Sequence, residues 1–151
     1  MTEPEPLHDD ESRLFSGSYF RHSLSQRVAN ARRHLHPMSI ALVRVREAVP
    51  LERMVEAVLG TVRESDTACR LEDGTIALIL EDTPENGAVW TVERLRRAVT
   101  DLTGAEVTLS AGVACYPAHA LEAEELLARA SGALASAQEW PQHRIEIALP
   151  E

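Results

Sequence analysis

Arg63 and Asp66 are the two residues of this chain whose types and spacing best suit binding chemistry. They lie three positions apart, at the predicted end of a helix, so we expect their side chains to share one face. An arginine fork pairs with a carboxylate or a phosphate through two hydrogen bonds, and a carboxylate accepts from N–H donors of a ligand. Arg94 is on the next predicted helix, which a crossover connection would bring alongside. The same residues could instead form a structural ion pair, with Asp66 tying the two arginines, and both interpretations stay open.

Other reactive side chains form patterns that favour structural roles. The first predicted helix has a basic side that could attract an anion, although we favour a solvated face. That side carries Arg21, Arg27, Arg32 and Arg33 together with His22, His34 and His36. Cys69 and Cys115 each lie inside a predicted strand, so we interpret them as buried thiols rather than a disulfide or a metal site. The sequence contains no CxxC, HxxxH or HExxH spacing, and we expect neither a metal ion nor a cofactor.

Length, composition and charge limit the class of protein. A chain of 151 residues with 44% hydrophobic residues suits one globular domain with a substantial core, which we place at residues 12–151. Residues 1–11 are acidic and contain proline without the basic and apolar regions of a signal peptide, so we expect a disordered tail and a cytoplasmic protein. No apolar run approaches the length of a membrane span. The net charge of −9 argues against nucleic acid as a partner, because phosphate binding requires a basic face.

A β-hairpin with a helix after it organises the middle of the chain. Two β-prone runs, Thr67–Leu71 and Thr75–Leu80, flank Asp73-Gly74, a pair that favours the two positive φ values of a type I′ turn. The second run contains the unbroken apolar stretch Ala77-Leu78-Ile79-Leu80, which is typical of a central strand covered on both faces. Thr83 is suited to an N-cap and Pro84 to the first helical position, so a third helix is predicted here.

The remaining elements surround this hairpin. We predict a helix from Ser16 or Ser18 to His34, a strand over Met38–Val45, a helix over Pro50–Glu64, a strand over Val107–Tyr116, a helix over Leu121–Trp140 and an edge strand over Ile145–Leu149. Small Ser110, Ala111 and Gly112 indicate close approach by a neighbour or a ligand. The order predicts an α+β fold with a ferredoxin-like βαββαβ core and a central, mainly antiparallel sheet. The two core helices would cover one face, and the extra N- and C-terminal helices the other.

Four segments resemble, in order and spacing, the GGDEF family of diguanylate cyclases, which join two GTP into cyclic di-GMP. The first, Asp9-Asp-Glu-Ser-Arg-Leu-Phe-Ser-Gly-Ser-Tyr-Phe20, is similar to the family's DPLTGLFNRRYF. Arg70-Leu-Glu-Asp-Gly-Thr-Ile76 falls on the R-x-GGDEF hairpin, and Val107-Thr-Leu-Ser-Ala-Gly-Val-Ala114 resembles VTISIGVA. Leu126-Leu-Ala-Arg-Ala-Ser-Gly-Ala-Leu-Ala-Ser-Ala-Gln138 resembles LLKRADEALYQAK. The resemblance implies a bacterial signalling domain with the nucleotide-cyclase fold.

The sequence departs from this family at the positions that carry catalysis. The family's two-metal mechanism requires carboxylates where this chain has Arg44 and Gly74. Glu72 and Asp73 replace the two glycines that let backbone approach the nucleotide, and Gln138 replaces a phosphate-binding lysine. The FKxINDxxGHxxGD segment, which cradles the guanine in the family, is missing. We therefore predict a degenerate domain without cyclase activity. The negative charges of Glu72 and Asp73 also disfavour GTP binding at the hairpin.

One family site is retained in the sequence. Many family members bind cyclic di-GMP at an inhibitory site made of an RxxD motif before the hairpin and an arginine on the following helix. Arg63-Glu-Ser-Asp66 has this motif at the family's spacing, and Arg94 matches the second arginine. The resemblance thus implies a cyclic di-GMP receptor, in which an arginine fork pairs with guanine O6 and N7 or with a phosphate and a carboxylate accepts from guanine N1 and N2. Arg70 and Arg97 are weaker additions that we expect to be solvated. The alternative is a module that dimerises or docks a regulatory protein, for which exposed Trp90 and Trp140 would supply contact area unless their rings pack on the core.

Overall fold

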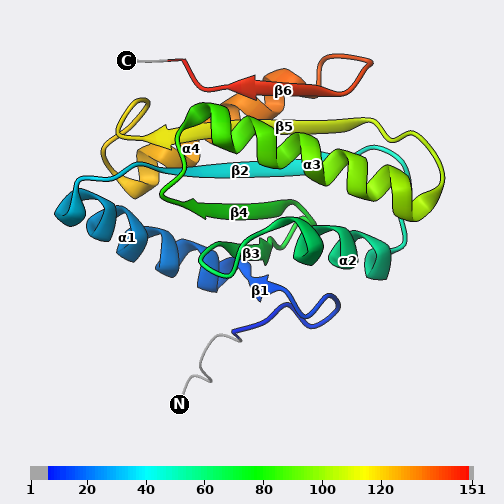
Figure 1. The fold of residues 1–151 in the computed structure, drawn as a ribbon, viewed down its shortest axis with the longest axis horizontal. Coiled ribbons are helices and arrows are strands. Elements are labelled where there is room, and N and C mark those ends of the chain that lie inside the picture. The colour runs from blue at the N-terminus through cyan, green and yellow to red at the C-terminus, as the bar shows by residue number, and fades with distance from the viewer. Residues whose placement is uncertain (1–6, 150–151) are drawn as a thin grey trace.

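The structure is a computed structural model that describes residues 7–149, and it contains one six-stranded sheet with four helices (Figure 1). The strands are β1 (Phe15–Ser16), β2 (Met38–Val45), β3 (Thr67–Arg70), β4 (Ile76–Glu81), β5 (Leu109–Tyr116) and β6 (Arg144–Ile147). The helices are α1 (Gly17–His34), α2 (Leu51–Thr61), α3 (Glu85–Thr103) and α4 (Ala123–Ala137). Within residues 7–149 none of these helices has the length and apolar character needed to cross a membrane.

The strand order β1-β3-β4-β2-β5-β6 places the predicted hairpin beside the predicted central strand. β2 pairs antiparallel with β4 on one side and with β5 on the other, so Ile40 lies opposite both Ile79 and Ala114. β3 and β4 form the antiparallel hairpin. The two outer pairs, β1 with β3 and β5 with β6, are parallel. The prediction that Met38–Val45 lies next to the second hairpin strand is confirmed.

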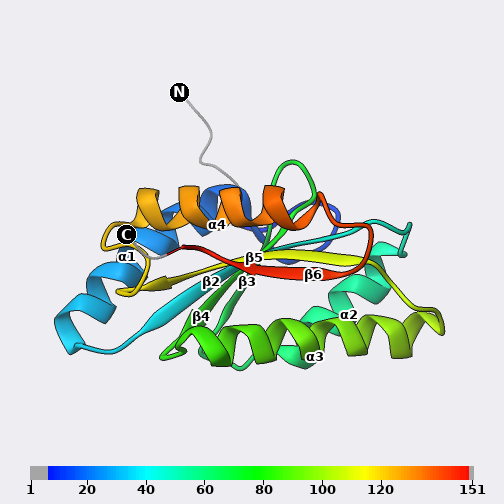
Figure 2. The same ribbon diagram turned by 90° about the horizontal axis from the view of Figure 1, so that it is seen from above.

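Two helical layers cover the sheet, as Figure 2 shows, with α1 and α4 on one face and α2 and α3 on the other. Successive side chains of a strand point to opposite faces, so each buried strand supplies both layers. Ile40 and Ile79 pack with α1 and α4, whereas Ala41 and Leu78 pack with α2 and α3. The unbroken apolar run in β4 is therefore buried on both faces, as the sequence predicted.

The hairpin turn differs from the predicted type I′ turn. Gly74 has a φ of 90°, but Asp73 does not take a positive φ. The Gly74 N–H donates to the Leu71 carbonyl at 2.9 Å, and the Leu71 N–H donates to the Thr75 carbonyl at 2.8 Å. The Asp73 carboxylate accepts from the Thr75 N–H at 3.0 Å, an Asx turn that holds a loop wider than two residues. The local side-chain hydrogen bond thus overrides the Asp-Gly preference.

Two helix ends also differ from the prediction. α2 ends at Thr61 rather than at Glu64. α3 begins at Glu85 with Pro84 as its N-cap, so Thr83 is not the cap. The Thr83 hydroxyl instead donates to the Glu81 carbonyl at 2.6 Å and accepts from Arg63 at 2.7 Å. These two hydroxyl contacts connect the loop before β3 to the start of α3.

The start of the chain differs from the expected disordered tail where the structure describes it. Asp9 forms an ion pair with Arg70 at 3.2 Å and accepts from the Ser12 hydroxyl at 2.7 Å, and Glu11 lies 3.6 Å from Arg70. These contacts hold residues 7–14 against the hairpin and lead into β1. Arg70 is thus paired rather than solvated. Residues 1–6 of the predicted tail lie outside the described residues.

Candidate functional site

Arg63 and Asp66 lie in the loop between α2 and β3, which we call the RxxD loop (residues 62–66), and not on a helix as predicted. The Asp66 carboxylate accepts from the Arg63 backbone N–H at 2.9 Å, and the Asp66 N–H donates to the Arg63 carbonyl at 3.0 Å. The Arg63 guanidinium lies 3.4 Å from the same carboxylate. The two residues are therefore brought together, but by a turn whose backbone they close.

The two side chains differ sharply in exposure. The Asp66 side chain is 3% exposed, and its second oxygen accepts from the Glu81 backbone N–H at 3.1 Å. The Arg63 side chain is 57% exposed, although its guanidinium also donates to the Glu81 carbonyl at 2.5 Å. Asp66 is thus a buried acceptor for backbone donors, with its lone pairs already used, and Arg63 is the partner that solvent can reach.

Arg27 of α1 fixes the RxxD loop from the other side of the sheet edge. Its guanidinium donates to the Glu81 carboxylate at 2.5 Å, to the Ser65 carbonyl at 3.2 Å and to the Thr67 hydroxyl at 3.0 Å. Its side chain is 30% exposed, and that of Glu81 is 13% exposed. The expected solvated basic face of α1 is therefore largely paired within the protein: Arg21 contacts Glu72, and Arg32 contacts Glu122.

Replacing Asp66 with alanine should lower the free energy of unfolding by about 1–3 kcal/mol, because the Arg63 N–H and the part-buried Glu81 N–H would both lose their acceptor. Urea denaturation followed by circular dichroism measures this loss. Glu64→Ala is the matched control, since Glu64 is exposed in the same loop and makes no hydrogen bond or ion pair with the described residues. Equal stability of the two variants would contradict the buried-acceptor role.

Arg94 lies on the exposed side of α3 and makes no ion pair or hydrogen bond within residues 7–149. It follows Glu85, the first residue of α3, by nine residues, which is about 14 Å along the helix axis. Arg63 contacts Thr83, immediately before that helix start. The structure therefore places Arg63 near one end of α3 and Arg94 further along it, without the direct Arg63–Asp66–Arg94 cluster that the sequence suggested.

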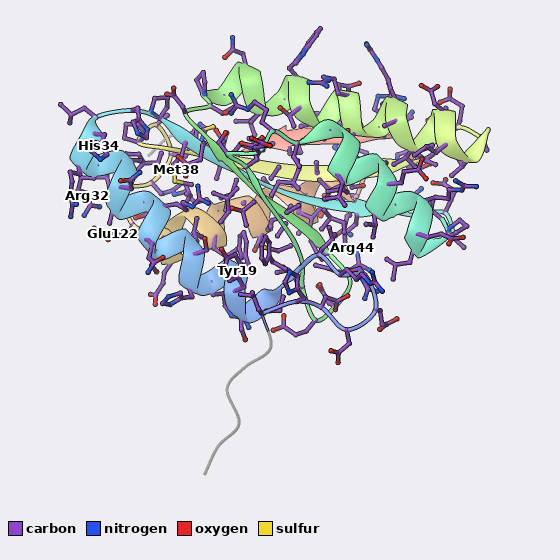
Figure 3. All side chains as sticks on the ribbon, turned by 60° about the horizontal axis from the view of Figure 1, so that its bottom comes forward. Tyr19, Arg32, His34, Met38, Arg44 and Glu122 are labelled. Carbon is purple, nitrogen blue, oxygen red and sulfur yellow. The ribbon has the colours of Figure 1, made fainter. Side chains whose placement is uncertain are left out.

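Arg44, where the resemblance implies a metal-binding carboxylate, hydrogen-bonds to the hairpin turn; its side chain is labelled in Figure 3. Its guanidinium donates to the Asp73 carbonyl at 2.7 Å and to the Thr75 hydroxyl at 3.2 Å, and it lies 3.8 Å from the Asp73 carboxylate. A cavity of about 160 Å³ beside it is lined by Arg44, Arg70, Glu47 and Gly74 over an apolar floor. Arg44 and Arg70 thus both line this cavity.

The other positions at which the sequence departs from the family pattern make internal contacts or are exposed. The Glu72 carboxylate binds Arg21 at 2.6 Å, a hydrogen bond that lowers the pKa of Glu72. Its carboxyl carbon lies 2.8 Å from where a Cβ on Gly17 would be, so it covers the start of α1. The Thr75 backbone N–H lowers the pKa of Asp73. Gln138 is an exposed residue that caps the end of α4.

The structure shows the state of the two cysteines and the exposure of the two tryptophans. Cys69 and Cys115 are free and buried, and burial raises the pKa of the Cys69 thiol to about 12, so this thiol is unreactive at neutral pH. Trp90 is 63% exposed and Trp140 is 45% exposed, so neither ring is packed in the core. The Arg144 guanidinium lies 4.2 Å from the centre of the Trp140 ring. Trp90 is therefore the tryptophan that is open to a partner.

Comparisons with solved structures agree with this fold. The GGDEF domain of PA1120 (YfiN or TpbB) from Pseudomonas aeruginosa is similar with 19% identity and a TM-score of 0.82, over 93% of this chain and 99% of that one. The DgcB GGDEF domain from Caulobacter crescentus in complex with c-di-GMP has 15% identity and a TM-score of 0.82, over 97% and 96%. Diguanylate cyclase SiaD in complex with its activator SiaC, also from P. aeruginosa, has 23% identity and a TM-score of 0.82, over 94% of this chain and 62% of SiaD.

At these identities the structural likeness concerns the fold alone. No curated protein matches the chain. The model of the family described as diguanylate cyclase, GGDEF domain, matches residues 50–144, which is more than half of the chain. The chain therefore belongs to the GGDEF domain family.

Proposed function

We propose that this chain is a catalytically inactive GGDEF domain that binds cyclic di-GMP through Arg63 and Arg94. The proposed lack of catalytic activity is supported by the hydrogen bond from the Arg44 guanidinium to the Asp73 carbonyl. A fixed positive charge at a metal position repels Mg²⁺, and the acidic ligands that the ion needs are absent from that position. Glu72 and Asp73 add negative charge where a triphosphate would lie.

The proposed binding of cyclic di-GMP rests on the exposure of two arginines, Arg63 and Arg94. Arg63 is anchored by Asp66 and by the start of α3, so its guanidinium is already oriented, which lowers the entropy lost on binding. Arg94 has no partner among the described residues. Asp66 has a different role from the predicted one: it positions Arg63 instead of contacting guanine, because its oxygens are already hydrogen-bonded. The similar DgcB domain was solved in complex with c-di-GMP.

Titration calorimetry with cyclic di-GMP tests the receptor proposal. We expect heat from the wild type, and Arg94→Ala should cost about 1–3 kcal/mol of binding free energy, as loss of a paired guanine or phosphate contact does. The melting temperature of Arg94→Ala should equal that of the wild type, because Arg94 makes no hydrogen bond or ion pair with the described residues. Arg97→Ala is the control, an exposed arginine one turn further along α3. Arg63→Ala should weaken binding and also lower the melting temperature, because the Arg63 guanidinium connects the RxxD loop to the Glu81 carbonyl by a hydrogen bond.

The second candidate function is a docking or dimerising module without nucleotide binding. Trp90 on α3 and Leu59 on α2, both about 60% exposed, favour it, because large apolar side chains on one helical layer supply contact area. Absence of both heat and thermal shift at micromolar cyclic di-GMP would reject the receptor proposal in favour of this one. Concentration-dependent oligomerisation of the wild type, reduced in Trp90→Ala, would then support it.

A further inference from the structure

A groove of about 290 Å³ lies beside the RxxD loop, and its walls come from segments far apart in the sequence. Its lining includes Leu59 from α2, Val62, Arg63 and Glu64 from the RxxD loop, Arg13 from the segment that leads into β1, and Phe15 from β1. Whole-ligand pockets span about 300–1,000 Å³. The groove is therefore of a size for one planar group of a larger ligand, and it shares Arg63 with the proposed binding surface.

Arg13 has an unusual backbone conformation at the edge of this groove. Its φ is 66°, in the left-handed region where side chains other than Gly, Asn and Asp are uncommon. Its side chain is exposed and forms no ion pair or hydrogen bond within residues 7–149. The Arg13 N–H donates to the Asp9 carbonyl at 3.2 Å, and the Asp9 N–H donates to the Leu14 carbonyl at 2.7 Å. The conformation therefore belongs to a closed turn that holds Arg13 in the lining of the groove.

Glu64 supplies the complementary charge. It is exposed, lines the same groove and has no hydrogen-bonding or ionic partner among the described residues, unlike Asp66 next to it. Arg13 and Glu64 do not pair with each other although both border the groove. The Arg13 guanidinium and the Glu64 carboxylate, both without a partner among the described residues, thus line a groove that also has apolar side chains.

We infer that this groove binds a guanine base, with Arg13 donating to O6 and N7 and Glu64 accepting from N1 and N2. These are the two polar edges that distinguish guanine from adenine, and Leu59, Val62 and Phe15 provide the apolar surface on which the base packs. The inference rests on the proposed function. Cyclic di-GMP carries two guanines, and the one in the groove belongs to a ligand whose other parts contact Arg63 and Arg94.

Calorimetry with cyclic di-GMP and cyclic di-AMP on four proteins tests this assignment. Arg13→Asn removes the guanidinium with a residue that tolerates positive φ, so the fold is kept. Leu35→Asn is its matched control, because Leu35 has a φ of 56° and is 91% exposed at the end of α1. Arg13→Asn and Glu64→Gln should each weaken cyclic di-GMP binding roughly 5- to 150-fold, and Leu35→Asn should not change it. The wild type should prefer cyclic di-GMP over cyclic di-AMP, and Glu64→Gln should reduce that preference.

The possible failures are distinguishable. Binding by the wild type that Arg94→Ala weakens, but that Arg13→Asn and Glu64→Gln leave unchanged, would overturn the guanine groove and keep the proposed function. An absence of binding by the wild type would overturn both. Melting curves of Arg13→Asn and Leu35→Asn should show unchanged or raised midpoints, so weaker binding of the former would not reflect unfolding.

Discussion

Replacing Gly112 with alanine should cost at least about 3 kcal/mol of the free energy of unfolding. Gly112 lies in the middle of β5, and a Cβ there would overlap the Ala130 carbonyl and the Leu134 nitrogen of α4 and lie 2.9 Å from the Leu134 Cα. These are backbone atoms of a helix, so they cannot move aside as the end of a side chain can. α4 would have to lift away from the sheet and expose its apolar face.

Urea denaturation followed by circular dichroism measures this cost. Gly132→Ala is the matched control, since Gly132 lies within α4 and a Cβ there meets nothing within 4 Å. That change should stabilise the protein by about 0.5–1 kcal/mol, because alanine favours a helix over glycine. A Gly112→Ala protein within about 1 kcal/mol of the wild type would show that α4 is not packed against β5 as described.

Incubated with GTP and either Mg²⁺ or Mn²⁺, the protein should form no cyclic di-GMP above a blank, which chromatography of the reaction would measure. In the proposed inactive domain, Arg44 and Gly74 replace the two expected metal-binding carboxylates, and neither residue supplies an oxygen ligand from its side chain. The combined change Arg44→Asp and Gly74→Glu should not restore turnover. Gly74 has a φ of 90° that glutamate adopts poorly, and the nucleotide-cradling segment is absent.

The result that would contradict this prediction is product formation that a change within this domain removes. Arg44→Ala is the informative variant there, because it deletes the guanidinium without adding a metal ligand. Turnover by the wild type that persisted in every such variant would point to a contaminating cyclase. Turnover that Arg44→Ala abolished would give Arg44 a catalytic role and reject the inactive-domain proposal.

Local and periodic features of the sequence determined most of the fold. Apolar side chains at helical or alternating spacing predicted four helices and five of the strands, because each element must bury its own apolar face. The apolar runs within Thr75–Leu80 and Met38–Val45 predicted neighbouring strands at the centre of the sheet. β1 was missed, since a two-residue strand has no periodicity, and its pairing with β3 depends on residues 7–14 docking through Asp9 and Arg70.

Only the tertiary structure decided how the candidate site is built. Asp66 looked like a ligand contact, but the Glu81 N–H, fifteen residues away, makes it a buried acceptor and leaves Arg63 as the exposed group. Arg13 and Glu64 lie inside family-like segments without being their defining residues, and they line one groove because the segment before β1 and the loop after α2 lie close together. The sequence determines which side-chain chemical groups the chain carries. Which of them are left unpaired depends on contacts between distant segments, since each possible partner is reached only after the chain has folded.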